Sequence, residues 1–294
     1  MKDLLRTVSY FTSIGQSLSA FHVWQYLYRP SREWSVGEVK KALEDARALS
    51  ERDGRFVLKG HEEIFDKEHD MYLDSDRKFR KARRIASLVS MIPGVRAVSV
   101  CNSLAWESTK RKSDTDFLVI CEPGRLWLAR FLAVGPLILL RRRPGERAVD
   151  PVDFTFFVSD RALDLSSLAI DGEDPYLAYW VASLVPLVDD GVVSEFCAHN
   201  EWVREILPNV TWRELARFRK SRATGLPFSI PHGALGWLEG HAKRLSHKRF
   251  PEQIRSKMNK SSHVIVNDDM LKFHVHDDRV QIRDNWQKIY EQLS

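Results

Sequence analysis

Two apolar runs of strand length, 95–101 and 117–121, constrain the fold of this chain more than any other feature, because a polar segment ending in acids separates them. Asp114 and Asp116 open the second run. Side chains at positions i and i+2 of a strand point to the same face, so these two carboxylates should lie side by side. Adjacent carboxylates repel each other unless a cation lies between them, and their oxygens are ligands that suit Mg²⁺. We therefore expect a sheet with a cation site at one strand end.

A third acid lies in a later strand pattern, 149–158. Val152 and Phe154 point to one face of this predicted strand, and Asp153 between them points to the other. Asp150, near the start of the same strand, is the alternative position for a third acid. The alternative is that such an aspartate has a structural role only, as the ion-pair partner of an arginine.

The turn residues Asn102 and Ser103, the pair Asp114 and Asp116 after a short gap, and Asp153 on a later strand resemble the nucleotidyltransferase superfamily of the DNA polymerase beta type. That family has a Gly-Ser or Gly-Gly turn after a strand, then Asp-x-Asp or Asp-x-Glu opening the next strand, and a third carboxylate on a further strand. The resemblance covers about residues 80–158.

The resemblance implies a catalytic and metal-binding role for Asp114, Asp116 and Asp153, which would hold two Mg²⁺ ions, with Mn²⁺ as the alternative. Asp153 would take the proton of the attacking hydroxyl. Asn102 and Ser103 would hold the terminal phosphates of the NTP. The reaction would be an in-line attack on the α-phosphate with pyrophosphate leaving, the two metals stabilising the entering and leaving oxygens.

Two points stay open in this segment. Asn102 stands where the family keeps a glycine, which allows a tight turn and close approach to phosphate. Because asparagine adopts left-handed conformations more readily than most residues, an active enzyme and a catalytically inactive member both remain. Lys110 and Lys112, in the loop before the acids, either contact the triphosphate or an acceptor, or form a solvated turn.

The N-terminal residues predict a winged-helix-like module. Ser19 is a plausible cap for a helix over 20–28, and Ser35 with Glu38 forms a capping-box pattern before a second helix. A turn at 53–54 and a strand at 55–60 follow. Such a module either contacts DNA through its second helix or serves as a packing and protein-contact domain.

Beyond the module, residues 61–78 predict a linker or a loose helix. A basic amphipathic helix then leads from about residue 77 to Pro93 and Gly94. Its basic face is either solvated surface or a phosphate contact. Further elements are predicted as helices at 125–140, 174–188, 195–207, 212–222, 234–247 and 280–293, and as strands at 264–267 and 271–275.

The bulk properties narrow the class of protein. The chain has 294 residues, 44% of them hydrophobic, and a formal net charge of +5, which permits contact with phosphates without requiring it. Its three cysteines match neither a disulfide framework nor a zinc site. The apolar stretch 126–140 is too short to span a membrane, which needs about 20 residues. We expect a cytoplasmic protein without membrane contact.

We therefore expect an α+β protein in three parts: a winged-helix-like module (1–75), a polymerase-beta-like nucleotidyltransferase core with a mixed sheet and flanking helices (76–162), and a mainly helical C-terminal domain (163–294). The predicted function is metal-dependent transfer of an NMP group from an NTP, with ATP as one candidate, to an acceptor hydroxyl. The acceptor stays open between an RNA or DNA end, a small molecule and a protein. The alternative is a DNA-binding regulator with an inactive transferase-like core.

Overall fold

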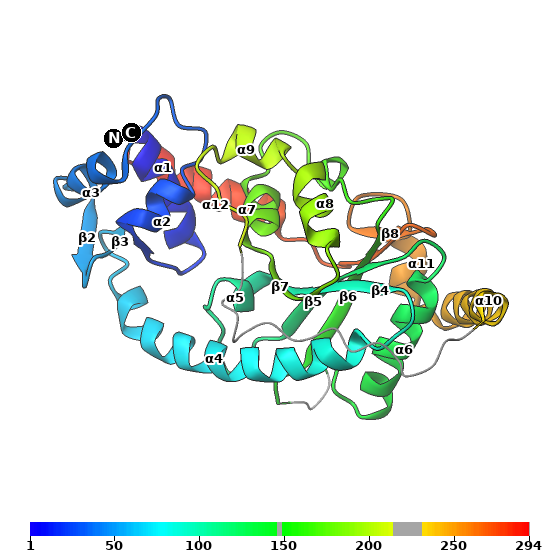
Figure 1. Cartoon of the computed structure of the whole chain (residues 1–294). Coiled ribbons are helices and arrows are strands. Elements are labelled where there is room, and N and C mark those ends of the chain that lie inside the picture. The colour runs from blue at the N-terminus through cyan, green and yellow to red at the C-terminus, as the bar shows by residue number, and fades with distance from the viewer. Residues whose placement is uncertain (146–148, 214–230, 294) are drawn as a thin grey trace.

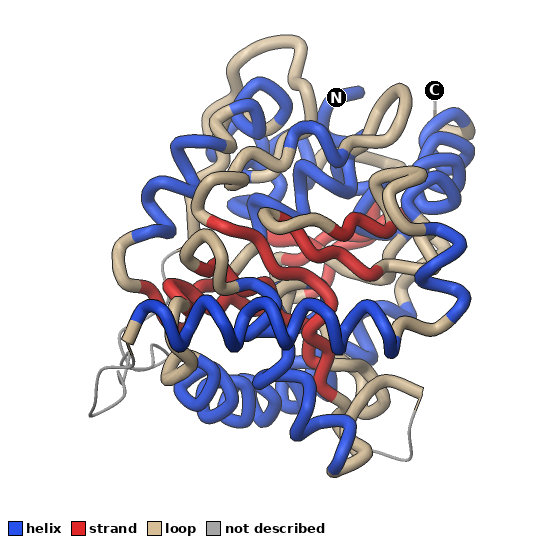
Figure 2. The backbone as a smooth tube through the Cα atoms, turned by 90° about the vertical axis from the view of Figure 1, so that its right-hand side faces the viewer, coloured by secondary structure: helices blue, strands red, loops and turns tan. Residues whose placement is uncertain are grey.

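The computed structural model describes residues 1–145, 149–213 and 231–293, which form a three-stranded and a six-stranded sheet flanked by helices (Figure 1). The expectation of an α+β fold is confirmed. The larger sheet is mixed, in the order β7-β4-β5-β6-β9-β8. Figure 2 shows its strands enclosed between helices, with α10, which Figure 1 shows end-on, lying lengthwise.

The smaller sheet belongs to the N-terminal residues and is antiparallel, in the order β1-β3-β2. The Ser19 hydroxyl accepts a hydrogen bond from the backbone N–H of His22, and Ser35 and Glu38 form the expected capping box. The elements here are α1 (Lys2–Ser13), β1 (Leu18–Ser19), α2 (Ala20–Gln25), α3 (Val36–Glu44), β2 (Leu49–Arg52) and β3 (Arg55–Leu58).

Helix α4 (Glu63–Val89) connects the two sheets. Its first turn packs Ile64 and Phe65 against Val57 of β3, and its later turns bury Phe79 and Ala82 against the larger sheet. The prediction of a linker or loose helix over 61–78 is wrong, because these residues are one continuous helix with the basic segment. The middle of α4 bridges two cores and buries few side chains, so its sequence lacks an apolar stripe.

The larger sheet takes strands from both sides of residue 163. Residues beyond that point, which were expected to form a mainly helical domain, supply three strands: β7 pairs with β4, β9 pairs with β6, and β8 pairs with β9. The strands are β4 (Val95–Val100), β5 (Thr115–Cys121), β6 (Val152–Ser159), β7 (Val185–Asp189), β8 (Val264–Val266) and β9 (Met270–Phe273).

Apolar side chains cover both faces of this sheet. On one face, Leu118 and Phe156 join a core that includes α1, α7 and α12; on the other, Phe117 and Phe154 stack at 4.7 Å over α4, α6 and α10. The remaining helices are α5 (Asn102–Ala105), α6 (Leu126–Leu139), α7 (Pro175–Ser183), α8 (Val192–His199), α9 (Trp202–Ile206), α10 (His232–Arg249), α11 (Glu252–Lys257) and α12 (Arg279–Glu291), with a 3-10 turn at Ser166–Leu168.

The prediction of a helix over 174–188 is wrong in its second half. Helix α7 ends at Ser183, and residues 185–189 form the edge strand β7 beside β4. A continuous apolar run does not distinguish a buried helix from a buried strand, so periodicity misses this change. The helix predicted over 195–207 is two helices, α8 and α9.

The helix predicted over 212–222 lies mostly outside the described residues. Cys101 and Cys121 are free and buried next to their strands, as expected of strand-end thiols. No helix in the described part of the chain combines the length and apolar character needed to span a membrane.

Candidate active site

Asp116 and Asp153 are direct register partners on the parallel strands β5 and β6. Partners in a ladder point to the same face, here the face opposite the stacked rings of Phe117 and Phe154. The sheet therefore brings together two carboxylates from positions far apart in the sequence. Asp114 immediately precedes β5, at the end of the strand from which Asp116 projects.

The charges of the three acids act on one another. Burial raises the pKa of Asp116 to about 6, and the charge of Asp114 adds to the shift. Burial raises the pKa of Asp153 to about 7, and the charges of Asp116 and Asp114 contribute. Burial also raises the pKa of Asp114. A cation bound beside carboxylates with raised pKa values would stabilise their ionised forms.

Asn102 is fitted to its position by both its backbone and its side chain. Its φ of 54° lies in the left-handed region that glycine favours. Its side-chain oxygen accepts hydrogen bonds from the Tyr176 hydroxyl at 3.1 Å and from the Trp180 Nε1 at 2.9 Å. A hydrogen bond from the same side chain lowers the pKa of Asp116. Asn102 thus makes the turn that glycine would make and links α7 to the acidic pair.

The other residues expected to hold the nucleotide differ in setting. Ser103 lies partly exposed in α5, next to Asn102. Lys110 and Lys112 lie exposed in the turn that leads to Asp114. They are on the same connection as the acids, and among the described residues neither side chain forms an ion pair or a hydrogen bond, so both interpretations of this turn stand.

Lys78 holds that turn from beneath. Its side chain is fully buried, and its Nζ donates to the backbone oxygens of Lys110 at 2.6 Å and Ser113 at 2.8 Å. It also pairs with Asp74 at 3.0 Å. Burial raises the pKa of Asp114, and the positive charge of Lys78 offsets part of that rise. This lysine therefore both anchors the turn and favours the ionised form of Asp114.

The basic face of α4 is therefore only partly a solvated surface. Arg77 forms a two-pronged ion pair with Asp150, with one bond of 2.6 Å, and Lys81 donates to the Asp150 backbone oxygen at 2.6 Å. The arginine holds the pKa of Asp150 below its usual range. Asp150 is a structural partner of α4, which leaves Asp153 as the third acid of the site.

The donor chemistry of the acidic group fits a hard cation. Asp116 and Asp153 offer carboxylate oxygens, which Mg²⁺ prefers, and neither forms an ion pair with a lysine or arginine among the described residues. Within residues 1–145, 149–213 and 231–293, no three His, Cys, Asp or Glu side chains are already gathered closely enough to hold a metal ion. The register pair is in place, and Asp114, at the end of a turn, is the member that a cation would draw in.

Sequence reasoning missed Lys78, Tyr176 and Trp180 as residues of this site. One signal for Lys78 was present, since it follows Ser75 by three residues and precedes Ala82 by four, on the buried side of α4. A lysine at an inward helical position indicates a specific partner. Tyr176 and Trp180 reach Asn102 from a distant helix, and no local pattern predicts such a contact.

Comparison of the chain with protein-family models, with curated proteins and with solved structures found no match.

Proposed function

We propose that this protein is a metal-dependent nucleotidyltransferase with a polymerase-beta-like core, which transfers an NMP group from an NTP to an acceptor hydroxyl. The observation that carries the proposal is the register pairing of Asp116 with Asp153 on adjacent strands, two carboxylates whose pKa values burial raises, with the charge of Asp116 adding to the shift of Asp153. Asp114 completes the set of acids. These residues would hold two Mg²⁺ ions, or Mn²⁺, and the ions would neutralise charge on the phosphate oxygens.

Asp153 is suited to accept the proton of the attacking hydroxyl. A general base works best when its pKa lies near the operating pH, and that of Asp153 is raised to about 7. The acceptor oxygen would form a bond to the α-phosphorus, the bond from that phosphorus to the bridging oxygen would break, and pyrophosphate would leave. The hydroxyl proton would pass to the Asp153 carboxylate.

The conformation and hydrogen bonds of Asn102 favour an active enzyme over a catalytically inactive member of the family. Its backbone has the left-handed conformation required of the family's glycine, and its side chain is hydrogen-bonded on both sides. Ser103 would contact the terminal phosphates from the same turn, and Lys110 and Lys112 are near enough in sequence to serve them.

The N-terminal elements support a winged-helix-like module, because a helix, a strand, two helices and two strands follow in order and the strands pair as β1-β3-β2. The regulator alternative is not favoured by α3, the helix that would enter DNA. On it Lys40 pairs with Glu44 at 3.7 Å, and Glu38 pairs with Arg32 at 3.0 Å, so acids offset its cations.

A transfer assay tests this proposal. The protein is incubated with each NTP labelled at the α-phosphate, with Mg²⁺ or Mn²⁺, and with nucleic-acid, small-molecule and protein acceptors. We expect labelled product from the parent and none from Asp116→Asn or Asp153→Asn, while Asp150→Asn keeps activity. Absence of product and of NTP binding in the parent would overturn the enzyme reading.

A further inference from the structure

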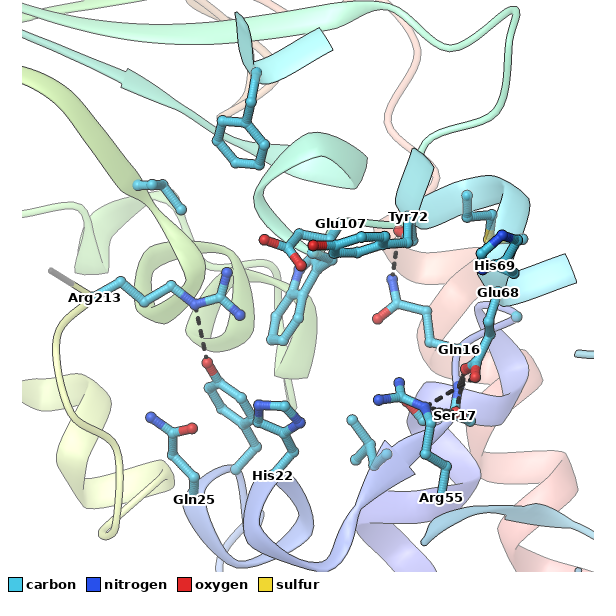
Figure 3. A pocket seen from close by; sticks show the side chains of 18 residues that line it. Gln16, Ser17, His22, Gln25, Arg55, Glu68, His69, Tyr72, Glu107 and Arg213 are labelled. Atoms are coloured by element: carbon cyan, nitrogen blue, oxygen red, sulfur yellow. Dashed lines mark hydrogen bonds and ion pairs between the residues drawn. The ribbon is translucent and has the colours of Figure 1, made fainter. Parts of the chain in front are cut away.

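A cavity of about 780 Å³ lies between the N-terminal module, α4 and the residues that follow α5 (Figure 3). Its volume falls within the range of sites for small organic ligands, roughly 300–1,000 Å³. Neither the expected cation site nor the expected phosphate contacts include the residues that line it. Its walls combine aromatic rings with guanidinium groups.

The aromatic rings come from three separate elements. Trp106 follows α5, and its ring is held at 5.1 Å from Phe11 and 5.0 Å from Tyr26, edge to face in both cases. Tyr72 reaches the cavity from α4 and remains 50% exposed. Rings fixed at a cavity wall stack with the bases of nucleotides, whatever the base.

Two guanidinium groups line the same cavity. Arg55 projects from β3 and pairs with Glu68 at 2.9 Å. Arg213 donates to the Tyr26 hydroxyl at 3.3 Å and to the Ala105 backbone oxygen, and its guanidinium lies 5.1 Å from the centre of the Trp106 ring. Within the described ranges Arg213 has no carboxylate partner.

The electrostatics of His22 report the combined field of these groups. After burial, the charges of Arg55 and Arg213 are the main causes that lower the pKa of His22. Both guanidinium groups line the cavity, and Figure 3 shows Arg213 and Arg55 on either side of His22. The carboxylates of Glu68 and Glu107 line the same cavity, so the phosphate is placed at Arg213, which, unlike Arg55, forms no ion pair with a carboxylate in the described part of the chain.

Short connections join the cavity to the acids. Helix α5 is four residues long, which corresponds to a rise of about 6 Å, and its first residue, Asn102, contacts Asp116. The residues after α5 are fixed from the other side, since Gln16 Nε2 donates to Ser108 Oγ at 3.0 Å. A ligand in the cavity would lie against this segment.

We propose that this cavity binds the acceptor of the transfer reaction and that the acceptor is a nucleotide. Its base stacks on Tyr72 and Trp106, its phosphate binds Arg213, and one of its hydroxyls attacks the α-phosphorus of the NTP. The pyrophosphate then leaves and the hydroxyl proton passes to Asp153. The role of acceptor rests on the proposed function, whereas nucleotide binding in the cavity does not.

Binding is measured by fluorescence anisotropy of a labelled single-stranded RNA octamer, with chelator present, and by competition with unlabelled AMP and CMP. We expect Tyr72→Ala and Arg213→Gln each to weaken binding about tenfold. The matched controls are Leu73→Ala, the exposed neighbour of Tyr72, and Arg84→Gln, an exposed arginine of α4 outside the cavity; both should bind as the parent does. Circular dichroism melts verify that all variants fold.

The results separate the two proposals. Loss of RNA binding in both cavity variants identifies a strand end as the ligand, and loss of AMP or CMP binding alone identifies a free nucleotide. Equal binding in the cavity variants and the controls, or no binding of either probe, overturns the inference. The Asp116→Asn, Asp153→Asn double variant should bind both probes as the parent does. If the parent binds them but transfers no NMP group, the proposed function is contradicted and the cavity site stands.

Discussion

The carboxylates of Asp116 and Asp153 lie in register on the parallel strands β5 and β6, and each is held at a raised pKa. Register partners on two parallel strands point to the same face of the sheet at a fixed spacing. The pairing of the strands therefore brings these two carboxylates together, and no loop is needed to do so.

Without a divalent cation, the protein should lose stability as the pH rises from about 5 to about 8. The pKa values of Asp116 and Asp153 are raised in the folded protein, to about 6 and about 7, above the ordinary value of 3.8. The folded state therefore binds more protons than the unfolded state between the ordinary pKa of 3.8 and the raised pKa of about 7, and its stability falls as the pH rises through this range. Thermal unfolding in chelator across this range measures the effect.

Asp153→Asn should flatten that pH profile and unfold at a higher temperature than the parent at pH 8. The exposed Asp70→Asn serves as the control and should leave the profile unchanged. Parent and Asp153→Asn profiles of the same slope between pH 5 and pH 8 would contradict the assignment, because His22 and His274, whose pKa values are lowered, act equally in both proteins.

Mg²⁺ or Mn²⁺ should raise the unfolding temperature, and more strongly at pH 8 than at pH 6. The cation binds the ionised carboxylates of Asp116 and Asp153, so it competes with protons whose pKa values lie between these two conditions. Titration of each ion at constant ionic strength, followed by differential scanning calorimetry, measures the shift. The same shift in an Asp116→Asn, Asp153→Asn double variant would show that the ion binds elsewhere.

Asn102→Ala should destabilise the protein more than Asn102→Gly, by about 1 kcal/mol, because alanine disfavours the left-handed conformation at φ 54°. Both changes leave the Trp180 Nε1 and the Tyr176 hydroxyl without their acceptor, which costs a further ~1–3 kcal/mol. Urea unfolding measures both free energies. If alanine and glycine are equally tolerated, the turn does not depend on this conformation.

Lys78→Met should destabilise the protein by about 3 kcal/mol, because it removes a buried charge that pairs with Asp74 and donates to two carbonyls of the turn before Asp114. Lys67→Met, an exposed lysine of the same helix, is the matched control and should change little. Hydrogen exchange at residues 110–113 distinguishes a loosened turn from global unfolding. Unchanged exchange there in Lys78→Met would contradict its anchoring role.

Asp150→Asn and Asp153→Asn should have opposite effects, although the two residues lie on the same connection. Asp150→Asn loses the ion pair with Arg77 and should cost about 1–2 kcal/mol of stability while transfer persists. Asp153→Asn should keep or gain stability and lose transfer. The two variants are compared by urea unfolding and by initial rate, and reversed effects would reassign the third acid.

The local parts of this fold were predictable from the sequence. The strands around Asp116 and Asp153 are short apolar runs bounded by turns, and the Ser35–Glu38 capping box marks a helix start; both patterns act within a few residues. The same reasoning failed at β7, where an apolar run fits helix and strand equally well, and the pairing partner decides.

The contacts that complete the site were beyond sequence reasoning for a related reason. Lys78 was grouped with the exposed basic residues of α4, since its partners are backbone carbonyls of a distant turn. Tyr176 and Trp180 read as core aromatics, and only the packing of α7 brings them to Asn102. Long-range contacts of this kind depend on which faces meet, which periodicity does not report.

The location of the bound cation tests the central claim most directly. A crystal of the protein with Mn²⁺ and an NTP that resists cleavage at the α–β bridge is measured for anomalous scattering at the manganese edge. The account predicts manganese about 2.1–2.2 Å from carboxylate oxygens of both Asp116 and Asp153, with Asp114 drawn in beside them. Manganese bound only at other acids, such as Asp74 and Asp150, with the register pair left without an ion, would contradict it.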